Sequence, residues 1–218
     1  MKYTTYIFDF DFTLADASTG IVASANYALD QLGFQAKGRD EIRKTVGMTL
    51  QDMFSALTSV QDNQLAEQFV VHFVHMADKI MTDNTILFDD TIDVLRRLKK
   101  ANCKTAIVTT KCHYRIDEAL KKYNIADLID CIIGFQDVDA AKPSPEGLLK
   151  AIAYLGVAES SVLYIGDSLI DANTAKRASI DFAAVTTGTT PANAFQQLSH
   201  VYIVSSLTEL MEQVNPAV

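Results

Sequence analysis

Short apolar runs alternate with longer amphipathic stretches along most of this chain, and this alternation restricts the fold more than any other feature. Short apolar runs are typical of buried strands, whereas apolar positions spaced three and four apart are typical of helices. The strand-like runs lie at 5–10, 104–109, 130–134, 162–165, 182–185 and 201–204. The helix-like stretches lie at 91–100, 114–123, 145–155 and 172–178. The pattern predicts an α/β fold, with a parallel sheet covered by helices on both faces.

Residues 16–83 break this alternation, because they contain no strand-like run. Apolar side chains instead recur there at helical spacing, at Ile21, Ala25, Ala28, Leu29, Leu32, Leu65, Phe69, Phe73 and Met76. Such stripes predict consecutive helices that pack against one another. We therefore expect an α/β core formed by 1–15 and 84–218, with 16–83 inserted after the first strand as an all-helical cap.

Charge and hydropathy exclude several classes of partner. The formal net charge is −8, with 27 acidic against 19 basic residues, which disfavours a nucleic-acid partner. No apolar run approaches the roughly 18 residues that a membrane span needs. Apolar and acidic residues mix from the first strand-like run onward, unlike a signal peptide. We expect a cytoplasmic protein with neither nucleic-acid nor membrane partner, and the sequence favours no oligomeric state.

Polar residues gather where the predicted strands end, and in open α/β sheets the working site lies beyond the carboxyl ends of the strands. The residues at these ends and in the adjoining loops are Asp9, Asp11, Thr13, Thr109, Thr110, Lys111, Lys142, Asp167 and Asp171. Carboxylates, hydroxyls and an ammonium are the groups that hold a divalent cation and a phosphoryl group together. The set therefore indicates phosphoryl-transfer chemistry.

Each of these residues taken alone has a commoner structural explanation. Thr109 could cap a turn at a strand end, and Lys142 could be a solvated loop lysine. Asp167 and Asp171 could be a helix N-cap and a first-turn residue. What chance does not readily give is the whole set in order, each member at a predicted strand end or in a loop.

The motifs that contain these residues resemble those of the haloacid dehalogenase superfamily. The matching segments are DFDFTL at 9–14, TTK at 109–111, KPSPEG at 142–147 and GDSLID at 166–171. The similarity extends over the whole predicted core, and 16–83 lies where this family carries a helical cap. The chain is most similar to the subgroup that holds phosphoglycolate phosphatase, β-phosphoglucomutase and small pyrophosphatases. The resemblance implies a Rossmann-like sheet in the core.

The resemblance also implies catalytic roles that general chemistry supports. Asp9 would attack phosphorus and become an aspartyl phosphate. Asp11 would protonate the leaving oxygen and later deprotonate the attacking water. Thr109, Thr110 and Lys142 would bind the phosphoryl oxygens, where Lys142 neutralises developing charge.

A magnesium ion is implied as the cofactor. By resemblance, Mg²⁺ would be held by Asp9, the backbone carbonyl of Asp11, and Asp167. Asp171 would orient a metal-bound water or Lys142 rather than ligate directly. A cation is also expected on physical grounds, because two carboxylates that face a phosphate dianion would repel it.

The function expected from the resemblance is a Mg²⁺-dependent phosphatase acting on a small phosphorylated metabolite, similar to phosphoglycolate. A hexose-phosphate mutase and an inorganic pyrophosphatase are alternatives with the same core residues. A catalytically silent binding protein is a third, disfavoured because Asp9 and Lys142 are present. The hexose-phosphate mutases of this family carry an arginine in the loop that corresponds to 47–51, and this chain has none there. In the cap, the candidates for substrate contact are Arg43, Lys44, Thr49 and Gln51, each of which could equally be a solvated helix-end residue.

Three positions depart from the family pattern. Phe12 stands where glycine is usual, and a phenylalanine restricts backbone angles that glycine permits. Thr110 replaces the usual asparagine of the second motif, and 88–90 reads Phe-Asp-Asp in place of a common Pro-Gly turn. None of these departures removes a catalytic carboxylate, so we expect them to affect specificity and loop motion more than activity.

Overall fold

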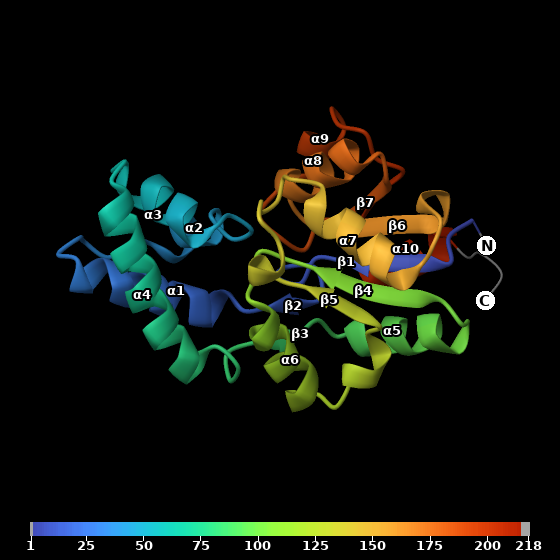
Figure 1. Ribbon diagram of the computed structural model, residues 1–218, viewed down its shortest axis with the longest axis horizontal. Coiled ribbons are helices and arrows are strands. Elements are labelled where there is room, and N and C mark those ends of the chain that lie inside the picture. The colour runs from blue at the N-terminus through green and yellow to red at the C-terminus, as the bar shows by residue number, and fades with distance from the viewer. Residues whose placement is uncertain (1, 215–218) are drawn as a thin grey trace. The chain divides into compact units, whose positions relative to one another are not determined.

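A computed structural model describes residues 2–214 of the chain, which divide into two compact units (Figure 1). One unit holds the chain up to Ala15 together with the chain from Leu87 onward, and the other is Asp16–Ile86. The helical unit thus extends to Ile86, whereas the sequence pattern places its end at 83. Where the chain passes between the units, β2 (Ala15–Asp16) and β3 (Ile86–Leu87) form a two-stranded sheet.

The larger unit is built on a six-stranded parallel sheet in the order β5-β4-β1-β6-β7-β8. The strands are β1 (Thr5–Phe8), β4 (Lys104–Val108), β5 (Cys131–Ile133), β6 (Val162–Gly166), β7 (Asp181–Val185) and β8 (Tyr202–Val204). In register, Phe8 at the end of β1 pairs with Ile107 of β4 and Ile165 of β6. The predicted α/β class with a parallel sheet is confirmed. From β1 the chain adds β4 and β5 on one side and then β6, β7 and β8 on the other, so the strand order reverses beside β1. In parallel α/β sheets, ligand-binding and active sites form at this switch point.

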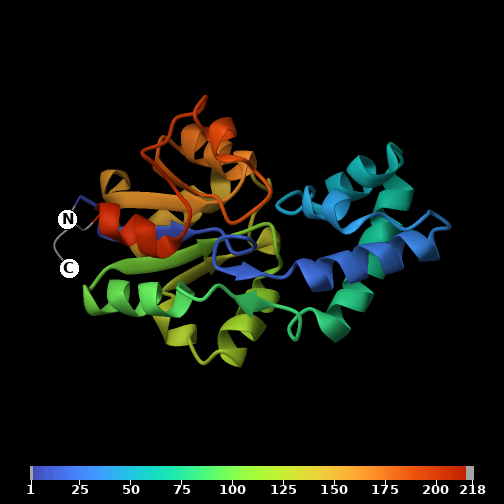
Figure 2. The ribbon, with the colours of Figure 1, turned by 180° about the vertical axis from the view of Figure 1, so that it is seen from behind.

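Helices cover both faces of this sheet (Figures 1 and 2). One face packs against α5 (Thr91–Lys100), α6 (His113–Lys122) and α10 (Leu207–Val214). The other packs against α7 (Glu146–Leu155), α8 (Leu169–Ala178) and α9 (Ala192–Phe195). Successive strand side chains point to opposite faces, so Tyr6 and Phe8 enter the first core while Ile7 enters the second. Short 3-10 helices lie at η1 (Ala126–Leu128), η2 (Phe135–Asp137) and η3 (Glu159–Ser161).

Two predicted boundaries shift in the structure for local reasons. The first strand stops at Phe8 rather than residue 10, because the chain then coils so that the Phe10 carbonyl accepts the amides of residues 13–15. Helix α8 begins at Leu169 rather than 172, because Ser168 caps it: Ser168 Oγ accepts the Asp171 N–H at 3.2 Å. Asp9 is therefore the first residue beyond β1, and Asp171 lies in the first turn of α8.

The helical unit has its own apolar core. Its helices are α1 (Ser18–Gln31), α2 (Arg39–Arg43), α3 (Leu50–Thr58) and α4 (Asn63–Ile80). In this core the ring of Phe69 lies between the rings of Phe54 and Phe73, with centroids 5.6 Å from Phe54 and 6.0 Å from Phe73. Burying each such side chain stabilises the unit by roughly 1.5–3 kcal/mol. Within residues 2–214, no helix is long and apolar enough to cross a membrane.

Candidate active site

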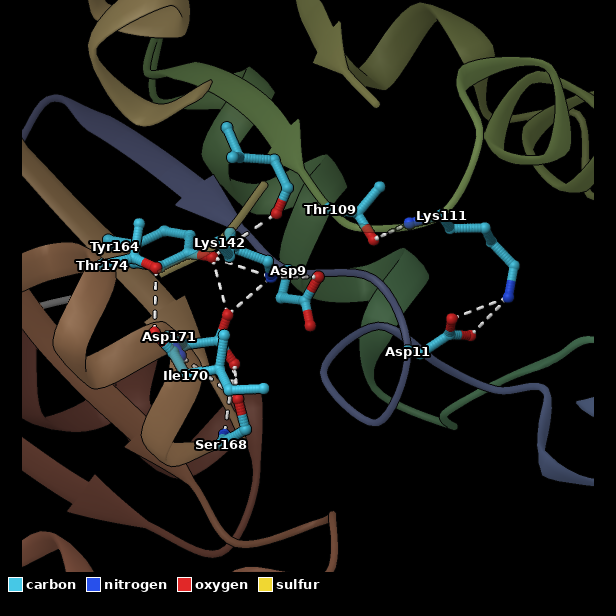
Figure 3. A network of polar contacts seen from close by, with 11 residues as sticks. Asp9, Asp11, Thr109, Lys111, Lys142, Tyr164, Ser168, Ile170, Asp171 and Thr174 are labelled. Atoms are coloured by element: carbon cyan, nitrogen blue, oxygen red, sulfur yellow. Dashed lines mark hydrogen bonds and ion pairs between the residues drawn. The ribbon is translucent and has the colours of Figure 1, made fainter. Parts of the chain in front are cut away.

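Asp9 occupies the centre of a buried polar cluster at the carboxyl edge of the sheet (Figure 3). Its backbone N–H donates to Ile165 O of β6 at 2.8 Å, which continues the strand pairing one residue past β1. Its carboxylate is 4% exposed, and Asp9 Oδ1 lies 2.9 Å from Lys142 Nζ. Asp9 and Lys142 are far apart in the sequence, and the parallel sheet brings the two charges together as the strand-end argument predicts.

The Lys142 ammonium contacts three polar groups. Lys142 Nζ forms an ion pair with Asp9, and it donates to Asp171 Oδ1 at 2.6 Å and to the Tyr164 hydroxyl at 3.2 Å. Burial alone would lower the pKa of Lys142, but the charges of Asp171 and Asp9 hold it above its ordinary value. Lys142 therefore carries a fixed positive charge beside Asp9.

Asp171 is the anchor of this arrangement. Its Oδ1 accepts from Lys142 and from the Tyr164 hydroxyl (2.8 Å), and its Oδ2 accepts from Ser168 Oγ (2.5 Å) and Ser168 N–H (3.2 Å). With both oxygens occupied by donors, the geometry favours a positioning role over metal ligation. The strand end needs a glycine here, because a Cβ on Gly166 would lie 2.5 Å from the Asp171 side chain.

Three buried carboxylates converge at this point. Asp9, Asp167 and Asp171 each offer an oxygen, and these atoms lie within 4.8 Å of one another. Within residues 2–214 no side-chain donor bonds the Asp167 carboxylate. Burial, and then the charges of Asp171 and Asp9, raise the pKa of Asp167 well above its ordinary value. Among residues 2–214, Lys142 is the one ammonium that pairs with any of these three carboxylates, so the cluster has an excess of negative charge, and its hard oxygen donors fit a divalent cation.

The raised pKa of Asp9 predicts how stability depends on pH in the cation-free protein. Burial raises this pKa from 3.8 to about 6, against the opposing charge of Lys142. Between these values the folded state holds a proton that the unfolded state has lost, so Asp9 lowers the free energy of unfolding as pH rises. The difference between 3.8 and about 6 corresponds to on the order of 3 kcal/mol.

Asp9→Asn cannot titrate, which makes it the matched variant for this effect. With a chelator present, its stability advantage over the wild type should grow as pH rises from about 4 to about 7, by up to about 3 kcal/mol. Denaturant unfolding at a series of pH values measures this difference. Saturating Mg²⁺ should remove most of it, because a bound cation favours the charged carboxylate. A difference that does not vary with pH would contradict the raised pKa.

Asp11 is turned toward a lysine rather than toward Asp9. Lys111 Nζ donates to Asp11 Oδ1 at 2.8 Å and to Oδ2 at 2.7 Å, and both side chains are largely buried (Figure 3). The sequence places Lys111 at this strand end, as the last residue of the TTK motif, but assigns it no role in the site.

The two threonines follow β4. Thr109 is buried, its Oγ1 accepts the Lys111 N–H at 3.2 Å, and Thr110 is half-buried in the same turn. Thr109 and Lys142 both line one small pocket, together with Gly134, Ala140 and Ala141. Its other walls include the apolar side chains of Val108, Ile133 and Val138, and Asp9 and Asp167 do not line it.

Tyr164 and Ser168 are site residues that the sequence did not reveal. Tyr164 lies inside β6, where its apolar neighbours make it look like an ordinary core residue, and its ring does pack into the core beside Phe182. Only the fold shows that its hydroxyl reaches Lys142 and Asp171. Ser168 carried a weak signal, since a serine three residues before an aspartate is a capping pattern.

The four cap candidates lie in the helical unit, and two have partners within it. Arg43 donates to Ser18 Oγ at 2.8 Å and lies 3.4 Å from Asp16 Oδ2. Thr49 caps α3, with its Oγ1 accepting the Asp52 N–H at 3.1 Å. Lys44 and Gln51 are exposed. Arg43 and Thr49 therefore stabilise the unit itself, and substrate contact by any of the four stays a prediction.

A family model and two relatives each match most of this chain. The family model of haloacid dehalogenase-like hydrolases matches residues 6–185. The chain is 30% identical over 211 residues to a phosphoglycolate phosphatase from Rhodobacter capsulatus, covering 94% of this chain and 95% of that one. It is 28% identical over 211 residues to the pyrophosphatase PpaX of Oceanobacillus iheyensis, covering 97% and 96%.

A solved structure is closer in sequence. A Bacteroides fragilis protein assigned to the haloacid dehalogenase-like hydrolases superposes with a TM-score of 0.94 at 44% identity, covering 96% of this chain and 100% of that one. The chain belongs to the haloacid dehalogenase-like hydrolase family. The resemblance drawn from the four sequence motifs is thereby confirmed.

Proposed function

We propose that this protein is a Mg²⁺-dependent phosphatase that hydrolyses a small phosphorylated metabolite through an aspartyl phosphate on Asp9. The observation that carries the proposal is the buried cluster in which the Asp9 carboxylate lies against the Lys142 ammonium and close to Asp167. The Lys142 ammonium would attract the negative oxygens of a phosphoryl group, which would bring the phosphorus next to the Asp9 carboxylate.

In the first half-reaction an oxygen of Asp9 attacks phosphorus, and the bond from phosphorus to the leaving oxygen breaks. Asp11 gives its proton to that oxygen, so the leaving group departs as a neutral alcohol. Lys142, Thr109 and Thr110 bind the phosphoryl oxygens. For this step the Lys111–Asp11 ion pair must open and Asp11 must first take up a proton from solvent, because a carboxylate paired with Lys111 has none to give.

In the second half-reaction Asp11 accepts a proton from water as the water oxygen attacks phosphorus. The bond between phosphorus and Asp9 breaks, which regenerates the Asp9 carboxylate and releases inorganic phosphate. Asp171 and Tyr164 keep Lys142 in place throughout, through the bonds described above.

Asp9, Asp167 and the backbone carbonyl of Asp11 would hold the magnesium ion. When bound, the ion neutralises the carboxylates and polarises the phosphoryl group. The support from this chain is the cluster of three buried carboxylates, to which Lys142 contributes one positive charge, which leaves negative charge for a cation to compensate.

The substrate class rests on the relatives. One relative is named a phosphoglycolate phosphatase and others are named pyrophosphatases, so a phosphoglycolate-like monoester is our first candidate and inorganic pyrophosphate the second. Both present a phosphoryl group joined to an oxygen leaving group, and both suit the same core residues.

The test is a turnover screen with Mg²⁺ across phosphoglycolate, pyrophosphate, hexose phosphates, nucleotides and an aryl phosphate. We expect phosphate release from at least one small monoester, lost when a chelator replaces Mg²⁺. Turnover confined to pyrophosphate would select the second candidate. Isomerisation of a hexose phosphate without net phosphate release would show a mutase instead, and binding without turnover of any compound would contradict the proposal.

A further inference from the structure

The backbone at Phe12 has a conformation that an L-residue rarely adopts. Phe12 has φ of 60°, in the left-handed region, and its side chain is buried. This region is unfavourable for bulky side chains, and glycine is the usual choice. Phe12 directly follows Asp11, so whatever maintains this backbone also fixes the turn that carries Asp11.

Hydrogen bonds fix the peptide groups on both sides of Phe12. The Phe12 N–H, in the peptide that also contains the Asp11 carbonyl, donates to Ala15 O at 2.7 Å. On the other side, the Thr187 hydroxyl donates to the Phe12 carbonyl oxygen. Within these contacts, the Thr187 bond is the one that comes from outside the turn, from the loop after β7.

That loop is firmly placed in the larger unit. Thr186 N–H donates to Val204 O of β8 at 2.9 Å, and the Thr186 hydroxyl donates to the same oxygen at 3.3 Å. Gly188, two residues after Thr186, lies so close to the Asp167 carboxylate that a Cβ there would overlap it. One anchored loop therefore contacts both the Phe12 turn and the Asp167 carboxylate.

We propose that Thr187 is a positioning residue: its bond to the Phe12 carbonyl holds the left-handed turn that places Asp11 for proton transfer. Thr187 touches neither reacting atoms nor substrate in this role. The bond also explains how phenylalanine is tolerated at a backbone position suited to glycine. The proposal rests on the proposed function, because it assumes that Asp11 is the acid and base.

The test compares three variants with matched chemistry. Thr187→Val removes the hydroxyl at nearly constant shape, and Thr187→Ser keeps the hydroxyl. Thr186→Val removes the neighbouring hydroxyl, which bonds Val204 rather than Phe12. For each, kcat/KM is measured on an alkyl phosphate and on an aryl phosphate with a good leaving group, and thermal unfolding reports on the fold.

We expect Thr187→Val to lower kcat/KM for the alkyl phosphate by roughly tenfold or more, and to affect the aryl phosphate much less, since a good leaving group needs little protonation. Thr187→Ser and Thr186→Val should stay close to the wild type on both substrates. Equal losses on the two substrates, or no loss, would overturn the positioning role. So would a Thr187→Ser variant as impaired as Thr187→Val.

A second measurement covers the case in which Thr187→Val unfolds. Phe12→Gly relieves the backbone constraint, so adding Thr187→Val to Phe12→Gly should lower kcat/KM for the alkyl phosphate by clearly less than tenfold, relative to Phe12→Gly alone. An undiminished cost in that background would also overturn the proposal. Failure of the proposed function is distinguishable, because it would appear as a wild type without phosphatase turnover, or as an active Asp9→Asn.

Discussion

Asp9→Asn should lose at least about a thousandfold in kcat while keeping its fold, a loss worth about 4 kcal/mol in the activation barrier. The substitution removes the attacking carboxylate and a proposed metal ligand at the same time. The fold should survive, because asparagine is nearly isosteric and Asp9 destabilises the cation-free protein above its raised pKa. Steady-state turnover on the best substrate of the screen measures the effect.

The matched control for this variant is Asp93→Asn, which changes an exposed aspartate in the first turn of α5. It should leave turnover unchanged. A hundredfold loss of kcat corresponds to an increase of about 3 kcal/mol in the activation barrier. If purified Asp9→Asn loses less than this, and so keeps more than about a hundredth of wild-type kcat, then Asp9 is not the nucleophile.

Asp11→Asn should divide substrates by their leaving groups. Without a general acid, attack on an alkyl phosphate must expel a poor leaving group unaided, and general acid–base catalysis typically contributes about 10²–10⁴-fold. An aryl phosphate should retain most of its rate of phosphoryl transfer to Asp9. Breakdown of the aspartyl phosphate should slow for every substrate, because the base for water is missing too.

Single-turnover kinetics on the two substrates separates transfer from breakdown. Lys142→Met is the comparison variant: it should slow all substrates together, since every substrate shares the phosphoryl group that Lys142 neutralises. If Asp11→Asn instead slows transfer from the alkyl and aryl phosphates by the same factor, the assignment of Asp11 as general acid is wrong.

The strand ends were predictable from the sequence because burial on both faces makes parallel strands into apolar runs, and a polar residue in the last two positions of a run or just beyond it marks the end. Asp9, Thr109 and Asp167 were found in this way. Their meeting in space follows from parallel pairing alone. Element boundaries were less exact, since the coil after Phe8 and the Ser168 cap depend on hydrogen bonds rather than on apolar periodicity.

The contacts that Tyr164 and Lys111 make in the site could not be predicted from the sequence, for a different reason. A tyrosine inside a strand contributes its ring to the core in most folds, and only the position of its hydroxyl relative to Lys142 gives it a second role. The Lys111–Asp11 pair joins residues on two separate loops. Neither partner follows a periodic pattern, so tertiary structure alone shows their contact.

A covalent phosphoryl group on Asp9 can be trapped in Asp11→Asn, which should transfer the group to Asp9 but hydrolyse it slowly. This variant is mixed with an aryl phosphate labelled in its phosphoryl group, quenched in acid, digested and mapped by mass. We expect about one hydroxylamine-labile phosphoryl group per chain, on the peptide that contains Asp9, and none in the Asp9→Asn/Asp11→Asn double variant. Label on another residue, or label that persists in the double variant, would show that Asp9 is not the residue that carries the phosphoryl group.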